Sequence, residues 1–294
     1  MPEPLPVIVN RSGGTASSLG DELEAALREA FAGQAIDLRL VEGGEVAGAV
    51  ARYVGRPLVA VGGGDGTQGA AAAALAGSGT AQLILPLGTR NHLARQLGVP
   101  LELPEAAKLP TTGRREAIDL AKANDRVFVN NASIGLYTRL VRERDKRWGP
   151  KWLGTIPAAW IVLMTMRAKP LQLTIDREAR RVVTPLLFIG NNRYSLDAGK
   201  VGQRETVSEG VLSLLAIERQ GPLSLIGFAI RALVGRADPQ RDFCELADAR
   251  EAIIAGAGAI EVALDGEVER MALPLRFAIM PGTLEVLVPA ERDA

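Results

Sequence analysis

A glycine-rich turn at residues 62–67 reads Gly62-Gly63-Gly64-Asp65-Gly66-Thr67 and indicates the fold more clearly than any other stretch. It follows the apolar run Pro57–Val61 and precedes the alanine-rich stretch Gln68–Ala76, which predicts a strand, a tight turn and a helix. Glycines let the backbone adopt positive φ and approach a ligand with no Cβ in the way. Because backbone amides and the positive end of a helix dipole favour anions, this turn predicts a phosphate-binding site.

Asp65 and Thr67 are the side chains of this turn that carry chemistry of their own. A carboxylate next to phosphates is repulsive unless a cation such as Mg²⁺ lies between them, or unless the carboxylate holds a hydrogen-bond donor. The alternative is that Asp65 is only a turn residue. Thr67 either caps the following helix or binds a phosphate oxygen. The turn is neither a Walker A loop, which needs Gly-Lys-Ser/Thr, nor a Gly-x-Gly-x-x-Gly motif with its ribose-binding acid.

Two more turns of small residues follow predicted strands in the first part of the chain. Asn10-Arg11-Ser12-Gly13-Gly14 follows the apolar run Leu5–Val9, and Pro86-Leu87-Gly88-Thr89-Arg90-Asn91 follows Gln82–Leu85. Strands alternate with helices throughout this part, which predicts an open, mostly parallel sheet covered by helices. Ligands of such a sheet bind at the carboxyl ends of its strands, so we expect the three turns to form one phosphate groove there.

From about Glu116 onward the pattern changes to strand-like runs separated by Gly, Asn or Asp, which predicts a β-rich antiparallel second domain. Two stretches, Lys151–Arg167 and Pro222–Val234, have helical character. We therefore predict a domain at residues 1–118 and a second at 119–294. The predicted strands are Ala117–Ala121, Val127–Asn131, Leu171–Ile175, Pro185–Gly190, Val211–Ile217, Ala259–Leu264, Leu275–Ile279 and Leu284–Val288.

The order of these motifs resembles the diacylglycerol kinase catalytic-domain family, which includes bacterial diacylglycerol and sphingosine kinase-like lipid kinases. Asn-x-x-Ser-Gly, Gly-Gly-Asp-Gly-Thr and Pro-x-Gly-Thr-x-Asn occur in the family's order, and Ile118-Asp119-Leu120, residues 130–135, residues 208–212 and Leu264-Asp265-Gly266-Glu267 also fit. The resemblance covers nearly the whole chain. It implies a Rossmann-like α/β domain, a β-sandwich, a nucleotide cleft between them, ATP, Mg²⁺ and a lipid hydroxyl as phosphate acceptor.

The resemblance also assigns roles to residues. Glu267 would accept the proton of the lipid hydroxyl, Asp65 would act in catalysis, and Glu209 would bind a structural metal ion. Three positions depart from the family pattern: Arg11 replaces a common Pro, His92 replaces an acid, and Ser208-Glu209-Gly210 replaces Asp-Asp-Gly or Asn-Asp-Gly. The nucleotide-binding residues would be Asn10, Ser12, Gly13, Gly63, Gly64, Asp65, Gly66, Thr67, Gly88, Thr89 and Asn91.

Composition limits the partners of the protein. The 294 residues include 34 basic and 34 acidic ones, so the protein has no net positive charge that would attract nucleic acid. A single cysteine excludes intrachain disulfides and thiolate metal clusters. The longest apolar run, Trp152–Met166, is too short to span a bilayer, and the N-terminus has no signal-like core, so we expect a soluble cytoplasmic protein. Residues 139–151 hold six basic residues, and all three tryptophans lie in or just after this segment. Because a lipid substrate requires access to a membrane surface, this favours peripheral contact with an anionic membrane over a plain charged loop. The sequence leaves open whether the protein forms a homodimer.

Two other functions stay open at this stage. Gly-Gly-Asp-Gly also occurs in NAD kinases, although the Gly-Thr-x-Asn turn and the lack of an Asn-Glu pair after the glycine turn argue against that enzyme. The departures at His92 and Ser208 leave room for a catalytically inactive protein that binds nucleotide or lipid. Phosphorylation of a lipid such as diacylglycerol is the leading hypothesis.

Overall fold

The computed structural model describes residues 3–135, 169–194, 204, 206–217 and 243–290. The chain divides into two compact units, one of Met1–Leu120 with Gly282–Ala294 and one of Ala121–Pro281. The expected division grouped residues 119–294 together. The structure instead groups the end of the chain with the first unit, because the last strand joins the parallel sheet there: Val286 pairs with Gln82. The expected helices Lys151–Arg167 and Pro222–Val234, and the basic segment 139–151, lie outside the described residues.

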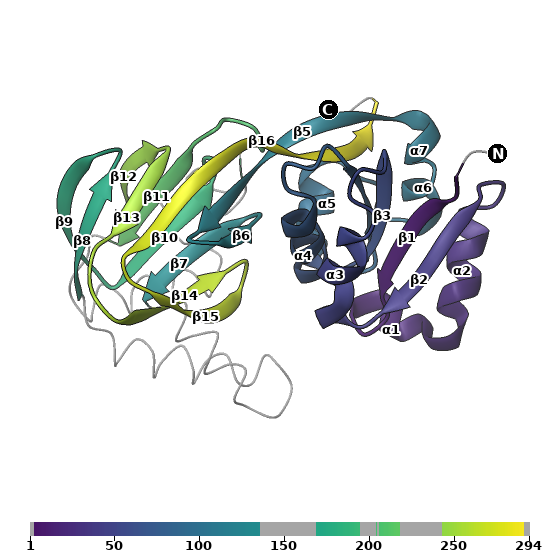
Figure 1. The fold of residues 1–294 in the computed structure, drawn as a ribbon, viewed down its shortest axis with the longest axis horizontal. Coiled ribbons are helices and arrows are strands. Elements are labelled where there is room, and N and C mark those ends of the chain that lie inside the picture. Colours follow the sequence, from purple (N-terminus) through teal and green to yellow (C-terminus); the bar gives the residue numbers. More distant parts are fainter. Residues whose placement is uncertain (1–2, 136–168, 195–203, 205, 218–242, 291–294) are drawn as a thin grey trace. The chain divides into compact units, whose positions relative to one another are not determined.

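The first unit contains a parallel sheet with the strand order β2-β1-β3-β4 (Figure 1). β1 pairs in parallel with β2 and β3, and β3 pairs in parallel with β4. The chain order reverses between β1 and β3, and this is the switch point at which ligands of doubly wound sheets bind. The strand bounds are Leu5–Asn10 for β1, Ile36–Val41 for β2, Leu58–Gly63 for β3 and Ala81–Pro86 for β4.

Helices cover this sheet, whose central strands are buried along most of their length. α2 buries Leu23 and Leu27, which are four residues apart and therefore lie on one face of the helix. The predicted α/β architecture is confirmed. The helices are α1 (Gly14–Leu19), η1 (Gly20–Glu22), α2 (Leu23–Ala30), η2 (Gly43–Glu45), α3 (Val46–Ala51), α4 (Asp65–Leu75), α5 (His92–Gln96), α6 (Leu103–Ala106) and α7 (Leu109–Thr112).

The second unit is a sandwich of two sheets, as predicted. One sheet has the order β12-β11-β10-β7-β14-β15 and is antiparallel throughout. The other is formed by β16, β13, β8 and β9, with β5 pairing to both β16 and β6. The strands are β5 (Gly113–Ala123), β6 (Arg126–Phe128), β7 (Asn131–Gly135), β8 (Lys169–Ile175), β9 (Glu178–Thr184), β10 (Leu186–Asn191), β11 (Leu212–Ile217), β12 (Phe243–Ala249), β13 (Glu251–Ile254), β14 (Ala259–Leu264), β15 (Glu267–Ala272) and β16 (Leu275–Pro289).

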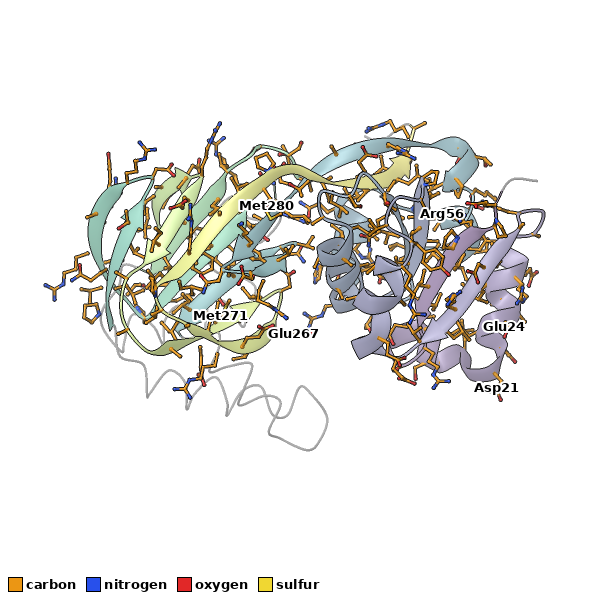
Figure 2. The ribbon with its side chains drawn as sticks, in the orientation of Figure 1. Asp21, Glu24, Arg56, Glu267, Met271 and Met280 are labelled. Carbon is orange, nitrogen blue, oxygen red and sulfur yellow. The ribbon has the colours of Figure 1, made fainter. Side chains whose placement is uncertain are left out.

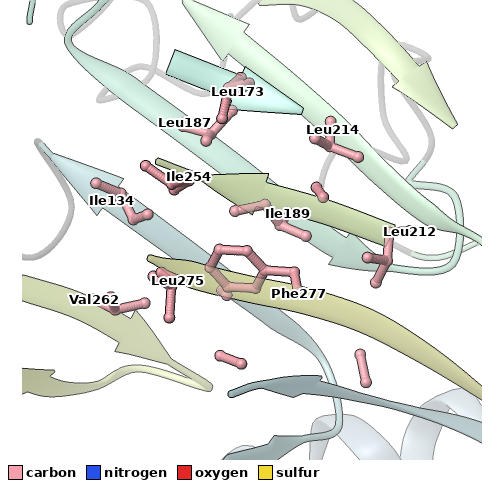
Figure 3. Close-up of a cluster of buried hydrophobic side chains, with 14 of the residues drawn as sticks. Ile134, Leu173, Leu187, Ile189, Leu212, Leu214, Ile254, Val262, Leu275 and Phe277 are labelled. Atoms are coloured by element: carbon pink, nitrogen blue, oxygen red, sulfur yellow. The ribbon is translucent and has the colours of Figure 1, made fainter. Parts of the chain in front are cut away.

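A single apolar core fills the space between these two sheets. Leu173, Ile254 and Phe277 come from one sheet, and Ile189 and Leu214 come from the other (Figure 3). All five are at most 2% exposed. Apolar residues that alternate along each strand place their side chains on one face, so burial of that face stabilises the sandwich.

Candidate active site

The three predicted turns meet at the carboxyl edge of the parallel sheet. A Cβ atom added to Gly88 would lie 2.3 Å from the Cα of Gly64, so these two backbones approach as closely as glycine allows. The Thr15 amide donates to the carbonyl of Leu87 at 2.9 Å, and a Cβ on Gly14 (φ +57°) would lie 2.6 Å from that same oxygen. The turns after β1, β3 and β4 therefore form one packed unit around the switch point.

Asn10 joins the first turn to the second. Its side-chain Nδ2 donates to the Thr67 hydroxyl at 3.0 Å, and its Oδ1 accepts the Ser12 amide at 3.0 Å. Thr67 is 7% exposed, so its hydroxyl faces the protein. Of the two roles considered for Thr67, no capping bond is present at α4 among the described residues, and the Thr67 hydroxyl accepts the Asn10 amide.

The glycines of the second turn differ in what they do. Gly63 has a φ of +154°, and a Cβ there would lie 2.5 Å from the Thr67 hydroxyl oxygen, so only glycine fits. Gly64 is the N-cap of α4, and the first helical hydrogen bond runs from the Gln68 amide to the Gly64 carbonyl. The amides of Asp65, Gly66 and Thr67 come before this first bond and therefore have no hydrogen-bond partner within the helix. Gly66 is exposed, which gives an anion access to the first turn of this 11-residue helix.

Asp65 lies in the first turn of α4 and reaches the next helix. Its Oδ1 accepts the Leu93 amide at 3.2 Å, at the start of α5. A carboxylate beside phosphates needs either a cation between them or a hydrogen-bond donor of its own, and Asp65 has the donor. The bond ties the second turn to the third and fixes the direction of one carboxylate oxygen.

Asn91 shapes the third turn from within. Its Oδ1 accepts the Gly88 amide at 2.9 Å, its Nδ2 donates to the Pro86 and Gly88 carbonyls, and its backbone adopts the left-handed conformation at φ +51°. Asparagine tolerates that conformation better than most residues. Thr89 and His92 are exposed on either side of it. Asn91 thus serves the turn's shape, and Thr89 offers its hydroxyl at the surface.

Glu42 is a residue of this edge that the sequence analysis did not single out. It directly follows β2, and its carboxylate accepts hydrogen bonds from the Arg11 Nε, at 2.7 Å, and from the Ser12 hydroxyl. The Ser12 hydroxyl, followed by Arg11, lowers the pKa of Glu42. A polar residue directly after the alternating run at Ala35–Val41 was the available signal, because the carboxyl ends of parallel strands share one edge.

Asp265 and Gly266 form a two-residue hairpin turn in the second unit, and Leu264 and Glu267 flank it. Leu264 pairs with Glu267, and Asp265 and Gly266 have φ values of +48° and +93°. Positive φ at both central positions is the geometry that Asp-Gly turns favour. Glu267 is exposed at the start of β15 (Figure 2), and its side chain has no hydrogen bond or ion pair to the described part of the chain.

The Asp265 carboxylate holds the chain where β6 ends and β7 begins. It accepts the amides of Val129 at 2.7 Å, Asn130 at 2.7 Å and Asn131 at 3.0 Å. Burial raises the pKa of Asp265, while the three amides and the Arg204 charge oppose that rise. The predicted strand Val127–Asn131 is interrupted here because these amides bond to a side chain and not to a neighbouring strand.

The carbonyl groups of the same segment are held from the other side. Buried Arg204 donates to the Val129 carbonyl at 2.7 Å and to the Asn130 side chain at 3.1 Å. The Tyr194 hydroxyl donates to the Asn130 carbonyl at 3.0 Å. Both the amides and the carbonyls of this segment are thus bonded within the second unit, which fixes the base of the turn that carries Glu267.

The described surroundings of Glu209 do not fit a divalent metal site. One Glu209 carboxylate oxygen accepts the Arg193 amide at 3.3 Å, and within the described ranges no three His, Cys, Asp or Glu residues gather as metal ligands would. Magnesium prefers several oxygen ligands in octahedral geometry. The phosphate turns and Asp65 belong to the first unit, whereas Glu209 and Glu267 belong to the second.

Comparison with known proteins gives the family. The model of the diacylglycerol kinase catalytic domain matches residues 4–123. A Pseudomonas aeruginosa protein named "Probable lipid kinase YegS-like" is 31% identical over 246 residues, which cover 80% of this chain and 78% of that protein. The chain belongs to this lipid kinase family.

A second relative matches over a shorter stretch, and a solved structure matches over nearly the whole chain. A Klebsiella pneumoniae protein of the same name is 45% identical over 92 residues, which cover 30% of this chain and 31% of that protein, so the match spans about a third of that relative. A solved structure titled as a diacylglycerol kinase from Bacillus anthracis has a TM-score of 0.68 at 22% identity, with 97% of both chains covered. At that identity the likeness establishes the shared fold.

Among the described residues, no helix has the length and apolarity needed to cross a bilayer.

Proposed function

We propose that the protein transfers the γ-phosphate of ATP to the hydroxyl group of a lipid, with diacylglycerol as the leading acceptor. The observation that carries this proposal is the packing of the turns after β1, β3 and β4 at the switch point, where Gly64 and Gly88 are in direct contact. Membership in the lipid kinase family supplies the acceptor class.

The phosphates of ATP would bind to backbone amides at the start of α4, with access through Gly66, and to the exposed Thr89 hydroxyl. Asn10, Ser12, Gly13 and Asn91 would hold the flanking turns in place. Mg²⁺ would arrive with the nucleotide and neutralise phosphate charge. Asp65 is the carboxylate of the second turn that would face this ion, through the oxygen that does not accept the Leu93 amide.

The reaction forms one bond and breaks one. The lipid hydroxyl oxygen attacks the γ-phosphorus, the bond from that phosphorus to the bridging oxygen breaks, and ADP leaves. The hydroxyl proton passes to a carboxylate, which we place on Glu267 because its exposed side chain is not engaged by the described residues. A lipid acceptor also requires access to a membrane surface, so we propose peripheral contact through residues 139–151.

An assay of ATP consumption with several acceptors tests the proposal. Diacylglycerol, ceramide, sphingosine, monoacylglycerol and NAD would each be added to purified protein with Mg²⁺ and ATP. Turnover with a lipid hydroxyl supports the proposal. Turnover with NAD alone supports the NAD kinase alternative, and ATP binding with no turnover supports an inactive binding protein.

A further inference from the structure

Three strand ends lie next to one another in the second unit. β10, β11 and β12 are neighbours, and β10 ends in Asn191 while β12 carries Asp248 directly opposite Ser213 of β11. The turn at residues 206–211 leads into β11. Resemblance to the lipid kinases led us to expect a structural metal ion at this turn, through Glu209.

The backbone of the turn is already bonded to protein. The Asn192 Oδ1 accepts the amides of Glu209, at 3.0 Å, and Gly210, at 3.1 Å, and the Asn192 amide donates to the Val211 carbonyl at 2.9 Å. Asn192 is fully buried. A single buried side chain therefore holds the backbone of the turn.

The neighbouring residue, Arg193, brings a positive charge to the acidic side chains at this corner. Its Nε donates to the Asp248 carboxylate at 2.5 Å, and its backbone amide donates to the Glu209 carboxylate at 3.3 Å. Asp248, Glu209 and Glu245 together raise the pKa of Arg193, and Asp248 contributes most. Arginine keeps its charge at any physiological pH.

Asp248 depends on this arginine. The carboxylate is 21% exposed, and its other oxygen, Oδ1, is buried with no hydrogen-bond partner in the described part of the chain. The Arg193 side chain is 51% exposed, so water screens the pair, but loss of the arginine would leave a partly buried carboxylate without its counter-charge and destabilise the fold. The guanidinium of Arg193 thus supplies a positive charge to Asp248, while the backbone amide of the same residue donates to Glu209.

We propose that Arg193 takes the place of a structural metal ion at this corner of the second unit, with its guanidinium on Asp248 of β12 and its backbone amide on Glu209 in the turn before β11. The stability of the nucleotide-free protein is then independent of divalent cations. Magnesium is needed only with ATP, so stability measured without nucleotide tests this inference independently of the proposed kinase activity.

Thermal unfolding of the full chain without nucleotide tests this in two parts. First, the Tm of the unsubstituted protein is measured with EDTA and with millimolar MgCl₂, and we expect the same value in both. Second, the Tm of Arg193→Met is expected to fall by about 2–4 °C, because Asp248 loses its counter-charge. Arg193→Lys, which keeps the charge, is expected to lose less.

Arg181→Met is the matched control, because Arg181 is an exposed arginine of β9 with no ion pair to the described residues. Its Tm is expected to stay within about 1 °C of the unsubstituted protein. If Arg193→Met does not fold, Asp248→Asn takes its place and is expected to lower the Tm in the same direction. A Tm that falls with EDTA and recovers with Mg²⁺ would overturn the inference, and so would an Arg193→Met protein as stable as Arg181→Met.

Discussion

The side-chain amide of Asn10 donates a hydrogen bond to the hydroxyl of Thr67 at 3.0 Å, across 57 positions of sequence. Asn10 ends β1 and Thr67 lies in the first turn of α4, so the bond joins the end of β1 to the helix that follows β3. The sheet reverses its order between these two strands. Ser12 and the amides at the start of α4 are both adjacent to it. The phosphate site that we propose therefore depends on a side-chain contact as well as on glycine.

Removal of this contact should loosen the site without unfolding the protein. Thr67→Val keeps the shape of the side chain but leaves the Asn10 amide without its acceptor, so we expect a loss of about 1 kcal/mol in the free energy of unfolding. The affinity for ATP, measured by calorimetric titration, should fall about tenfold, which corresponds to about 1.4 kcal/mol. Thr67→Ser retains the hydroxyl and serves as the control, with affinity close to that of the unsubstituted protein.

Gly66→Val tests the access of phosphate to the start of α4. Gly66 is exposed, and valine is a better helix former than glycine, so the fold should be retained. The added side chain should block the anion and abolish measurable ATP binding. Gly64→Val should do the same, although its Cβ would also press on the Gly88 Cα at 3.4 Å. Unchanged ATP affinity in a folded Gly66→Val protein would remove this turn from the site.

Gly63→Ala differs from the Gly66→Val and Gly64→Val variants, because it changes the shape of the turn and not the access of phosphate to it. The residue has positive φ, and its Cβ would collide with Thr67, so we expect a lower Tm together with weaker ATP binding. Gly66→Val should weaken binding at an unchanged Tm. Thermal unfolding of the two variants side by side distinguishes the two effects.

Asp65 has two roles to separate, the hydrogen bond to Leu93 and the proposed negative charge beside Mg²⁺. Asp65→Asn keeps an oxygen for the Leu93 amide, so its Tm should change little, whereas Asp65→Ala should lose about 1 kcal/mol of stability. Turnover should fall at least about 100-fold in both variants if the charge matters, since charge neutralisation dominates phosphoryl transfer. An Asp65→Asn enzyme with full activity would leave Asp65 with the structural role alone.

Glu267 and Asp265 are two residues apart and should behave in opposite ways. Glu267→Gln should fold normally, keep its ATP affinity and lose about 10²–10⁴-fold in turnover, because a general base is removed. Asp265→Asn replaces a carboxylate that accepts three amides, so we expect it to lose about 1–3 kcal/mol of stability. Chemical denaturation and steady-state kinetics on both variants make the comparison. Full activity of a folded Glu267→Gln protein with its lipid acceptor would exclude Glu267 as the base.

The sequence predicted the architecture of the first unit because the relevant signals are local. The alternation of apolar strands, small-residue turns and helices fixes a parallel sheet, and the turns at Gly13, Gly64 and Gly88 necessarily share its carboxyl edge. The Asp265-Gly266 hairpin was predictable for the same reason, since two adjacent residues determine it.

Contacts between distant residues could not be predicted in this way. The sequence does not show that Asp265 would bond to the amides of residues 129–131, 134 to 136 positions away, and so does not show the interruption of the predicted strand Val127–Asn131. β9 was missed because an edge strand exposes charged side chains such as Arg180 and Arg181, which hide the alternating pattern. β16 was predicted as two short strands because Pro281 and Gly282 interrupt the apolar run, yet the structure carries one strand through them.

Residues 139–151 should bind the protein to anionic membranes. Sedimentation with vesicles should increase with the fraction of anionic lipid and decrease with salt, since exposed charges are screened beyond about 8–10 Å at physiological ionic strength. Replacement of Arg142, Arg144 and Arg147 with Glu should release the protein. Vesicle binding that responds neither to salt nor to this substitution would exclude an electrostatic membrane contact at these residues.

Transfer of labelled phosphate from ATP to lipid tests the central claim most directly. Protein, Mg²⁺, ATP labelled at the γ-phosphate and mixed micelles of candidate lipids would be incubated, and the organic phase would be separated and examined by mass spectrometry. We predict a labelled lipid monophosphate with the unsubstituted protein and only a trace with Glu267→Gln. A folded protein that binds ATP but leaves every lipid unlabelled would contradict the account.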